Sequence, residues 1–413
     1  MDEIATKFSR IRALTEEICK PLIHEDYVIQ SIPEVSPVKW HIAHITWFFE
    51  NFILIPHYKN YKIFDINYNF IFNSYYNSVG KMLDKNKRSI LSRPSVEEIY
   101  KYRKYVNDLI LELIKNADQQ TKSIVLPLLE IGLNHEQQHQ ELLLMDIKNN
   151  FYHNPLKPVY IDNELEISLC EKLSWVDIPE QVIRIGHQNL DFSFDNELPV
   201  HKSYINGCTI ASRPVLNGEF VDFINSGGYD DPRYWLSDGW SCKNNESWKA
   251  PLYWEKDQNN WSIFTLNGLK KLDEYQPVCH ISYYEADAFA TWSGKRLPSE
   301  FEWEAVAKDL KIEGNFLDNK KYQPHVDTFD KSAIQQMYGD VWEWTSSAYL
   351  AYPGFKALYE GLGEYNGKFM INQMVLRGGC CVTPKEHIRL TYRNFFYPQN
   401  RWQFSGMRLV NDD

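Results

Sequence analysis

The sequence has few of the features that mark secreted, membrane-spanning or nucleic-acid-binding proteins. Its seven cysteines are scattered from Cys19 to Cys381 without a Cys-x-x-Cys pair, which fits reduced thiols better than a disulfide framework or a zinc ribbon. No apolar run approaches membrane-spanning length, and the start Met1–Ser9 lacks a basic region followed by an apolar core. We therefore expect a cytoplasmic protein with no membrane partner.

Positive charge is also scarce. There are 44 Lys and Arg residues against 55 Asp and Glu, which gives a formal net charge of -11. Nucleic-acid binding as the main activity is therefore not expected, because it needs an electropositive face. The composition, 44% hydrophobic and 15% aromatic, is that of a globular protein, and a length of 413 residues favours two or three domains.

The N-terminal part carries the periodicity of amphipathic helices. Apolar residues spaced three and four apart, from Ile4 to Ile18, predict a helix that ends at Pro21. Ser36 and Pro37 predict the N-cap and first position of a second helix, which extends to Ile53. Two further helices are expected, one at 95–113 after a capping box and one around 133–146. Together they predict a four-helix bundle over residues 1–155.

The composition and the hydrophobic pattern of the sequence change at the linker expected at 156–175. Of the 13 tryptophans, only Trp40 and Trp47 precede this linker. Residues 176–413 contain short alternating segments interrupted by Gly, Pro, Asn and Asp, such as 181–186, 201–210 and 374–379. This pattern predicts a second, loop-rich α+β domain.

Two histidines of the fourth helix have the spacing of a metal site. His135 and His139 are four residues apart, so both project from one helix face and can bind one ion. The second helix offers His41 and His44 as further ligands, and spacing alone leaves both open. Glu141 follows His139 by two residues, which rotates it about 200° around the helix, so we expect it outside the ligand set. A three-histidine site is the better prediction.

Several motifs extend along nearly the whole chain. They are Trp40–Glu50, Phe72–Tyr76 and His135–Glu141 in the first domain, and Trp292–Glu304, Gly339–Trp344, Glu364–Phe369, Arg377–Gly379, Tyr392–Phe396 and Arg401–Arg408 in the second. In this combination the chain resembles the ergothioneine-type sulfoxide synthases, or hercynine oxygenases. The resemblance implies an α+β protein, with a DinB-like four-helix bundle followed by a formylglycine-generating-enzyme-like domain of the C-type-lectin kind.

The resemblance also implies a site. The metal would be Fe(II), held by His44, His135 and His139, with His41 left as a core histidine or one that supports a ligand. Dioxygen would be the co-substrate. Tyr75 and Tyr76 match an active-site tyrosine pair that supplies a proton, and Tyr365 is the next candidate for that role.

Substrate contacts follow from the same resemblance. The family joins the sulfur of cysteine or γ-glutamylcysteine to C2 of hercynine, the trimethylated betaine of histidine, and oxidises the sulfur to a sulfoxide. Gln138 would contact the imidazole substrate. Asn394, Phe395 and Phe396 would receive its trimethylammonium group, since a cation without N–H donors favours aromatic faces. Arg88 and Arg93 are candidates for the carboxylate of the thiol substrate.

Other functions stay open at this point. Histidine as acceptor would give an ovothiol-type enzyme, and a selenium donor a selenoneine-type one. Ovothiol enzymes usually carry a fused methyltransferase, whereas this chain ends at Asp413, so we expect hercynine, made by a separate methyltransferase. A zinc-dependent thiol transferase and a non-enzymatic binding protein are further alternatives. Adjacent Cys380 and Cys381 lack the spacing of the catalytic cysteines of formylglycine-generating enzymes, and we expect them to be buried thiols.

Overall fold

The computed structural model describes residues 2–164, 166–170, 172–258, 260–326, 333–358 and 360–412. The chain forms two compact units. The first comprises Met1–Tyr160 together with Leu358–Tyr365, and the second comprises Ile161–Ala357 and Asn366–Asp413. The short segment Leu358–Tyr365 therefore belongs with the N-terminal unit, whereas the sequence analysis had assigned it to the second domain.

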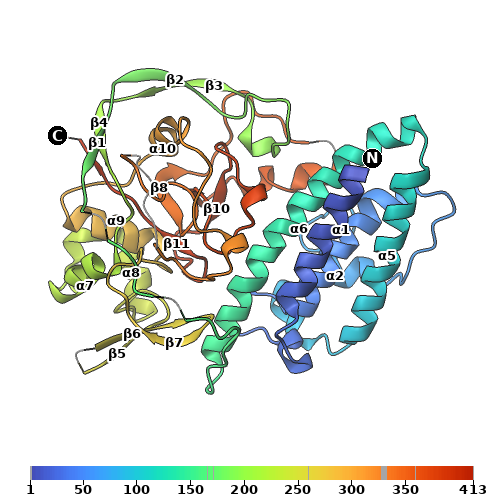
Figure 1. The fold of residues 1–413 in the computed structure, drawn as a ribbon, viewed down its shortest axis with the longest axis horizontal. Helices are drawn as coiled ribbons and strands as arrows, with labels where there is room; N and C mark the ends of the chain where they lie inside the picture. The colour runs from blue at the N-terminus through green and yellow to red at the C-terminus, as the bar shows by residue number, and fades with distance from the viewer. Residues whose placement is uncertain are drawn as a thin grey trace. The chain divides into compact units, whose positions relative to one another are not determined.

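Four long helices run side by side in the first unit (Figure 1). They are α1 (Asp2–Cys19), α2 (Val38–Phe49), α5 (Val96–Asn116) and α6 (Gln119–His153). Shorter elements are η1 (His24–Val28), η2 (Glu50–Leu54), α3 (Ile55–His57), α4 (Tyr68–Phe72) and η3 (Lys85–Ile90). The predicted helical bundle is confirmed.

Helix α2 is the centre of this bundle. Every residue from Val38 to Phe49 is buried, as expected for a helix that other elements cover on all sides. It contacts both α5 and α6. Gly132 of α6 permits a close approach, because a Cβ atom at that position would lie 2.6 Å from Cε1 of Phe49. Residues on the face of α2 that packs against α6 can thus meet residues of α6.

Both ends of α2 differ in detail from the sequence prediction. The helix begins at Val38 with Pro37 as its N-cap, and no side chain caps it. The prediction of Ser36 as N-cap was wrong, since its Oγ instead accepts a hydrogen bond from Nη1 of Arg88 at 2.8 Å. At the other end the last turn, Glu50–Leu54, is a π-helix. Buried Glu50 accepts hydrogen bonds there from the hydroxyls of Tyr61 and Tyr102.

The capping box at Ser95 is confirmed, with Oγ accepting from the N–H of Glu98. Helix α6 is longer than predicted and continues through Pro127. Its Glu136 carboxylate accepts from Arg12 and Arg103 in the bundle interior, at 2.8 and 2.7 Å. These buried ion pairs anchor α6 on the side next to His135.

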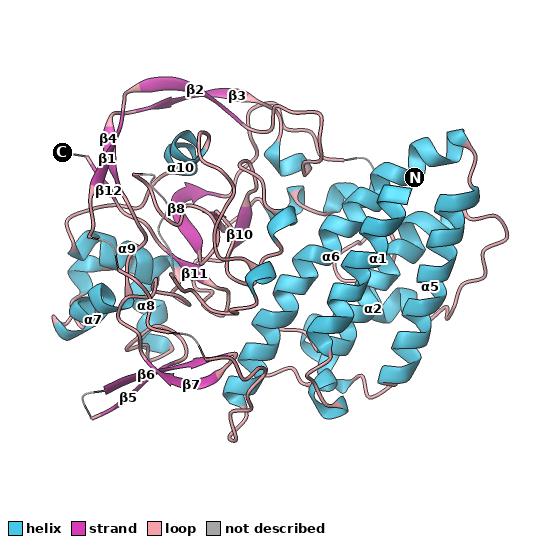
Figure 2. Ribbon diagram, viewed as in Figure 1, coloured by secondary structure: helices cyan, strands magenta, loops and turns pink. Residues whose placement is uncertain are grey.

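The second unit contains the strands, drawn in magenta in Figure 2. A four-stranded sheet has the order β10 (Asn394–Phe396), β9 (Met374–Arg377), β8 (Trp342–Ala348) and β11 (Ser405–Gly406). A three-stranded sheet has the order β1 (Trp175–Ile178), β4 (Cys208–Ala211) and β12 (Val410–Asn411). The remaining strands are the pair β2 (Gln181–Ile185) and β3 (His201–Ile205), and the meander β5 (Trp254–Asp257), β6 (Asn260–Thr265) and β7 (Gly268–Lys271).

Four helices of the second unit are α7 (Asn217–Asn225), α8 (Ser237–Asn245), α9 (Tyr283–Trp292) and α10 (Glu300–Ala307). Buried ion pairs connect its segments to helix α10 and strand β8, among them Arg377–Glu304, Arg393–Glu300 and Arg408–Glu343. The predicted α+β class is confirmed. Among the described residues, none of the seven cysteines forms a disulfide.

Glu197 provides a test of these buried pairs. Its carboxylate is fully buried and accepts from Arg389 and from the hydroxyl of Thr391. Burial raises the pKa of this carboxyl, but the Arg389 guanidinium and the hydrogen bonds outweigh burial and hold the pKa below its usual value. Because the folded-state pKa is lowered, this contribution to stability is present above the unfolded pKa and is lost as the pH falls below about 4.3.

Replacing Glu197 with Gln is expected to lower the free energy of unfolding at pH 7 by about 3–5 kcal/mol, because the buried guanidinium of Arg389 loses this carboxylate partner. Urea unfolding monitored at pH 7 and pH 4 measures the effect, which should shrink at the lower pH. Glu274→Gln, at an exposed position, is the control. Equal stability of the two variants would show that the ion pair contributes nothing.

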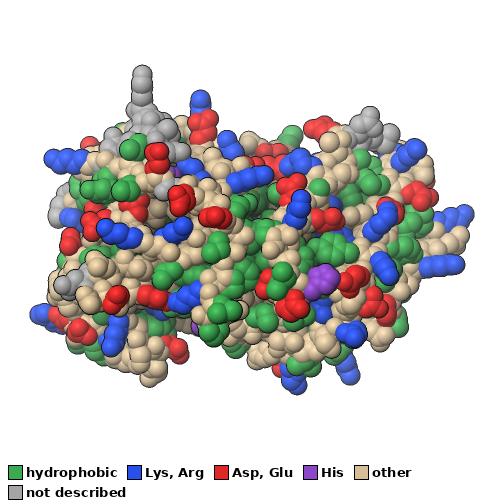
Figure 3. Space-filling view, turned by 60° about the horizontal axis from the view of Figure 1, so that its bottom comes forward, with side chains coloured by type: hydrophobic (Ala, Val, Ile, Leu, Met, Phe, Trp, Pro, Cys, Tyr) green, Lys and Arg blue, Asp and Glu red, His purple; other side chains and the backbone are tan. Residues whose placement is uncertain are grey.

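Charged side chains are mixed on the face shown in Figure 3, where Lys and Arg alternate with Asp and Glu. None of the described helices is both long and apolar enough to cross a membrane.

Candidate metal centre

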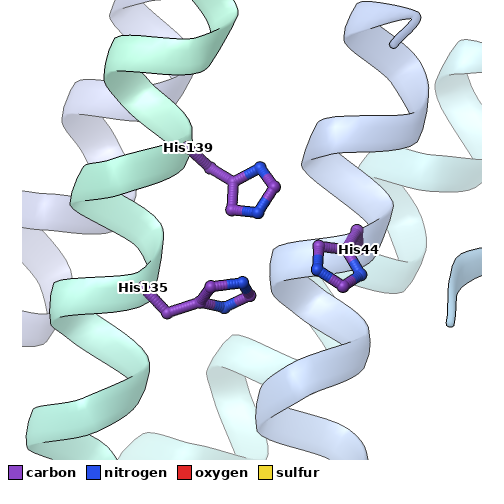
Figure 4. A group of neighbouring side chains, drawn as sticks. All are labelled: His44, His135 and His139. Atoms are coloured by element: carbon purple, nitrogen blue, oxygen red, sulfur yellow. The ribbon is translucent and has the colours of Figure 1, made fainter. Parts of the chain in front are cut away.

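Three buried histidines converge between helices α2 and α6. His135 and His139 project from one face of α6 toward His44 of α2 (Figure 4). Each offers one ring nitrogen, and these three nitrogens lie within 4.8 Å of one another. The sequence had left His41 and His44 open until the resemblance favoured His44, and His44 is the histidine that joins the cluster.

The ring of His44 is fixed on both faces and at one edge. It stacks on Trp40, with centroids 4.6 Å apart, and on Trp47, with centroids 5.6 Å apart. Its Nδ1 lies 2.7 Å from the carbonyl oxygen of Phe72. A carbonyl can only accept, so Nδ1 carries the proton and Nε2 keeps its lone pair for a ligand.

The three imidazoles are neutral in this environment. Burial lowers the pKa of His135 to about 3, and burial together with the neighbouring imidazoles lowers the pKa values of His44 and His139 well below their usual value. A neutral imidazole has the lone pair that a metal ion needs. The site therefore does not have to lose protons at neutral pH before it binds a metal.

Unsatisfied polar atoms support a metal site at this position. Within the described part of the chain, Nε2 of His44 and both ring nitrogens of His135 are buried without a hydrogen-bond partner. Leaving such atoms unpaired costs about 1–3 kcal/mol each, so buried polar atoms normally have partners. One divalent ion would bind Nε2 of His44 and one of the two ring nitrogens of His135, and three nitrogen ligands suit iron and zinc alike.

A pair of tyrosines follows the segment that fixes His44. The rings of Tyr75 and Tyr76 stack with centroids 4.5 Å apart, and their hydroxyls are 3.4 Å apart. Tyr76 is fully buried and also packs on Trp47. Burial raises the pKa of both phenols above their usual value, so both keep their protons throughout the neutral range.

Tyr365, the last residue of the segment Leu358–Tyr365, lies beside both His135 and Tyr75. Its ring lies 5.6 Å from that of His135 and 6.3 Å from that of Tyr75, measured between centroids. Its hydroxyl donates to Oε1 of Gln138. The neighbouring Glu364 accepts hydrogen bonds from the backbone N–H groups of Asn77 and Ser78. These bonds connect the segment to the residues that directly follow Tyr75 and Tyr76.

These contacts join six aromatic rings into a closed series, in which each ring packs against the next. Successive centroids are 4.5–6.3 Å apart around the series, which consists of His44, Trp47, Tyr76, Tyr75, Tyr365 and His135. The three tyrosine rings thus lie next to the histidine cluster. Such an arrangement can hold a metal ion and donate protons beside it.

The two arginines proposed for a carboxylate occupy different environments. Arg88 is buried, with its guanidinium carbon 3.3 Å from the ring centroid of Trp40, and its Nη atoms donate to Ser36 and Ser74. Burial lowers its pKa to about 9. Arg93 is exposed and donates to the carbonyl of Ser92. Arg93 is thus the more accessible of the two.

Asn394, Phe395 and Phe396 form strand β10 of the second unit. Phe395 stacks on Tyr349, with centroids 4.0 Å apart, and on Phe369, at 6.0 Å. Phe396 packs edge-on against Trp402. All three residues of the strand are half-buried. Cys380 and Cys381 are fully buried in this unit.

Three partners of the histidine cluster were not predicted from the sequence. Asp146 accepts from His41, which in turn contacts His139, and Trp40 and Trp47 enclose His44. An acidic residue seven positions after His139 lies on nearly the same helix face, because seven residues complete almost two turns. This spacing could have indicated Asp146.

The fold and the site together define a two-domain protein whose helical bundle carries a buried cluster of three histidines that can hold a metal ion. The Sulfatase-modifying factor enzyme 1-like domain family matches residues 176–332 and 316–413, and the DinB superfamily matches residues 7–143. The chain therefore belongs to the sulfatase-modifying factor enzyme 1-like family, with a DinB-superfamily domain at its N-terminal side.

Curated relatives agree with this combination. The chain is 33% identical over 244 residues to a hercynine oxygenase of Mycolicibacterium smegmatis, covering 53% of this chain and 56% of that protein. It is 32% identical over 247 residues to a hercynine oxygenase of Mycobacterium tuberculosis, with the same coverage. The ergothioneine biosynthesis protein 1 of Schizosaccharomyces pombe is 27% identical over 371 residues, which cover 78% of this chain and 44% of that protein. The chain thus spans about half the length of the curated relatives it matches.

Proposed function

We propose that the protein is an iron(II)- and dioxygen-dependent sulfoxide synthase. It would join the sulfur of cysteine or γ-glutamylcysteine to C2 of the imidazole ring of hercynine. The reaction balances without a further reductant: the C2–H and S–H bonds are lost, a C–S bond forms, one oxygen atom becomes the sulfoxide oxygen and the other leaves as water. The buried three-histidine cluster with three tyrosine rings beside it is the observation that carries this proposal.

Each part of the site has a task in this reaction. Iron(II) held by His44, His135 and His139 would have about three further positions and would supply the redox chemistry with dioxygen. Tyr75, Tyr76 and Tyr365 hold phenol protons beside the cluster, and the formation of water consumes protons. Gln138, next to His139, would orient the imidazole substrate through its amide. Asn394, Phe395 and Phe396 remain our proposal for the trimethylammonium group.

Metal content and oxygen consumption test the proposal. Protein purified without oxygen and loaded with iron(II) should consume dioxygen only when hercynine and a thiol are both present. The matched experiment loads zinc, because a zinc-dependent thiol transferase uses the same three nitrogen ligands. A zinc-loaded protein that transfers thiols, with no oxygen uptake in the iron-loaded form, would overturn the sulfoxide synthase proposal.

Product analysis identifies the two substrates. Incubation of the iron-loaded enzyme with hercynine or histidine, each combined with cysteine, γ-glutamylcysteine or a selenosugar, should give one dominant product by mass spectrometry. We expect a hercynine sulfoxide. A histidine-derived or selenium-containing product would instead define an ovothiol-type or a selenoneine-type enzyme. We place this reaction in the cytoplasm.

The two arginines allow a separate prediction on the thiol substrate. Arg93→Ala should raise the apparent KM for the thiol by about tenfold, the loss of roughly one charge-assisted hydrogen bond, with little change for hercynine. Arg88→Ala should instead lower stability, because it removes a buried side chain stacked on Trp40. Steady-state kinetics and thermal unfolding separate these effects. Equal KM values for wild-type and Arg93→Ala enzymes would remove Arg93 from the thiol site.

A further inference from the structure

A buried hydrogen-bonded chain lies behind one of the three metal-binding histidines. Nδ1 of His139 is 2.8 Å from Nδ1 of His41, and Nε2 of His41 is 2.9 Å from Oδ2 of Asp146. Helix α2 supplies His41, and helix α6 supplies the other two residues. His41 and Asp146 are each only 2% exposed. We propose that His41 and Asp146 are positioning residues, which select the tautomer and orientation in which His139 presents Nε2 to the metal.

The direction of the hydrogen bonds follows from the last acceptor. Oδ2 of Asp146 also accepts the backbone N–H of Ser36 at 2.7 Å, so this oxygen is an acceptor and Nε2 of His41 donates to it. In the neutral imidazole of His41, Nδ1 then keeps its lone pair and accepts a hydrogen bond from Nδ1 of His139. Nε2 of His139 is consequently unprotonated. The opposite direction would place a proton on Nε2 of His139 and prevent it from binding a metal.

Each metal-binding histidine is held differently. The backbone carbonyl of Phe72 fixes His44, whereas both nitrogens of His135 lack a partner among the described residues. The tautomer of His139 depends on side chains alone, and mutation can remove them. Arg88 supports the chain from outside, since it donates to Oγ of Ser36, whose N–H binds Asp146. The supporting chain thus extends from Nδ1 of His139, the nitrogen that does not bind the metal, to the buried guanidinium of Arg88.

This inference requires the three-histidine metal site of the proposed function, but neither a particular metal nor a particular reaction. Carboxylates and other groups that orient metal-bound histidines typically change metal affinity by about 10–100-fold when removed. We therefore expect Asp146→Ala and His41→Phe to weaken binding of cobalt(II), a spectroscopic substitute, by about 10–100-fold. Asp146→Asn should have a smaller effect, because an amide oxygen still accepts.

The measurement is an anaerobic cobalt(II) titration of the metal-free protein, followed by its visible absorption. Glu130→Gln is the control, because Glu130 lies on the same helix and accepts from Lys7, and its affinity for cobalt should equal that of the wild type. Urea unfolding of each metal-free variant shows whether it folds. Should Asp146→Ala fail to fold, Asp146→Asn and His41→Phe decide the question.

Nitrogen-15 NMR of the histidine side chains tests the tautomer directly in the metal-free wild type. We expect His139 to carry its proton on Nδ1, and a proton on Nε2 would overturn the inference. Unchanged cobalt affinity in folded variants with lowered stability would also overturn it, since the chain would then be only a structural hydrogen-bond network. A wild-type protein that binds no metal would overturn both this inference and the proposed function. Normal metal binding without turnover would overturn the proposed function but not the inference on His139.

Discussion

Replacing His44, His135 or His139 with alanine is expected to abolish metal binding and turnover. Each of these residues supplies one of three nitrogens within 4.8 Å of one another, and two imidazoles alone hold a divalent ion poorly. The loss of affinity should exceed the 10–100-fold (about 1–3 kcal/mol) that is typical of removing a group that only supports a ligand. Metal content after reconstitution and desalting, measured by mass spectrometry, gives the result.

His153→Ala is the matched control, because this histidine is also on α6 but is exposed at its end. It should bind one metal ion per chain, as the wild type does. His41→Ala should still bind metal, though more weakly. If His41→Ala were free of metal while His44→Ala remained loaded, the ligand on α2 would be His41.

The second large effect is expected at the tyrosines. Oxidation of the thiol alone, to cysteine sulfinate, competes with C–S bond formation, and a phenol proton at the right position should favour the coupling. Tyr75→Phe and Tyr76→Phe keep the stacked rings but delete a hydroxyl. In at least one of them the ratio of sulfoxide to sulfinate should fall by about 100-fold or more, the lower end of a general acid's contribution. Chromatography of products at matched oxygen consumption measures this ratio.

Tyr27→Phe provides the control, since Tyr27 is a buried tyrosine of the same unit whose hydroxyl donates to the carbonyl of Cys19. Its product ratio should match that of the wild type. Because the pKa values of Tyr75 and Tyr76 are raised, deprotonation of these phenols should not reduce activity below pH 10. Wild-type ratios in both tyrosine variants would reduce the pair to aromatic packing and make Tyr365→Phe the next variant to measure.

Much of the local structure could be read from periodicity. The stripe from Ile4 to Ile18 and the capping box at Ser95 predicted helices that the structure contains, and the segments 181–186 and 374–379 predicted strands β2 and β9. These patterns are local, since neighbours along the chain determine which face is apolar and where a cap lies. The end of α2 was less predictable, because its π-helical turn occurs where Glu50 binds tyrosines from elsewhere in the bundle.

The sequence by itself determined that His135 and His139 share a helix face, because a spacing of four residues permits little else on an α-helix. Spacing could not choose between His41 and His44, since α2 is buried on every side and both residues lie within the bundle. Distant partners decided this choice: the carbonyl of Phe72 orients His44 toward the cluster, and Asp146 holds His41 behind His139. Only the tertiary structure showed that Tyr365 belongs to the site. The eight-residue segment Leu358–Tyr365 packs with a bundle far away in sequence, and no local sequence pattern indicates this packing.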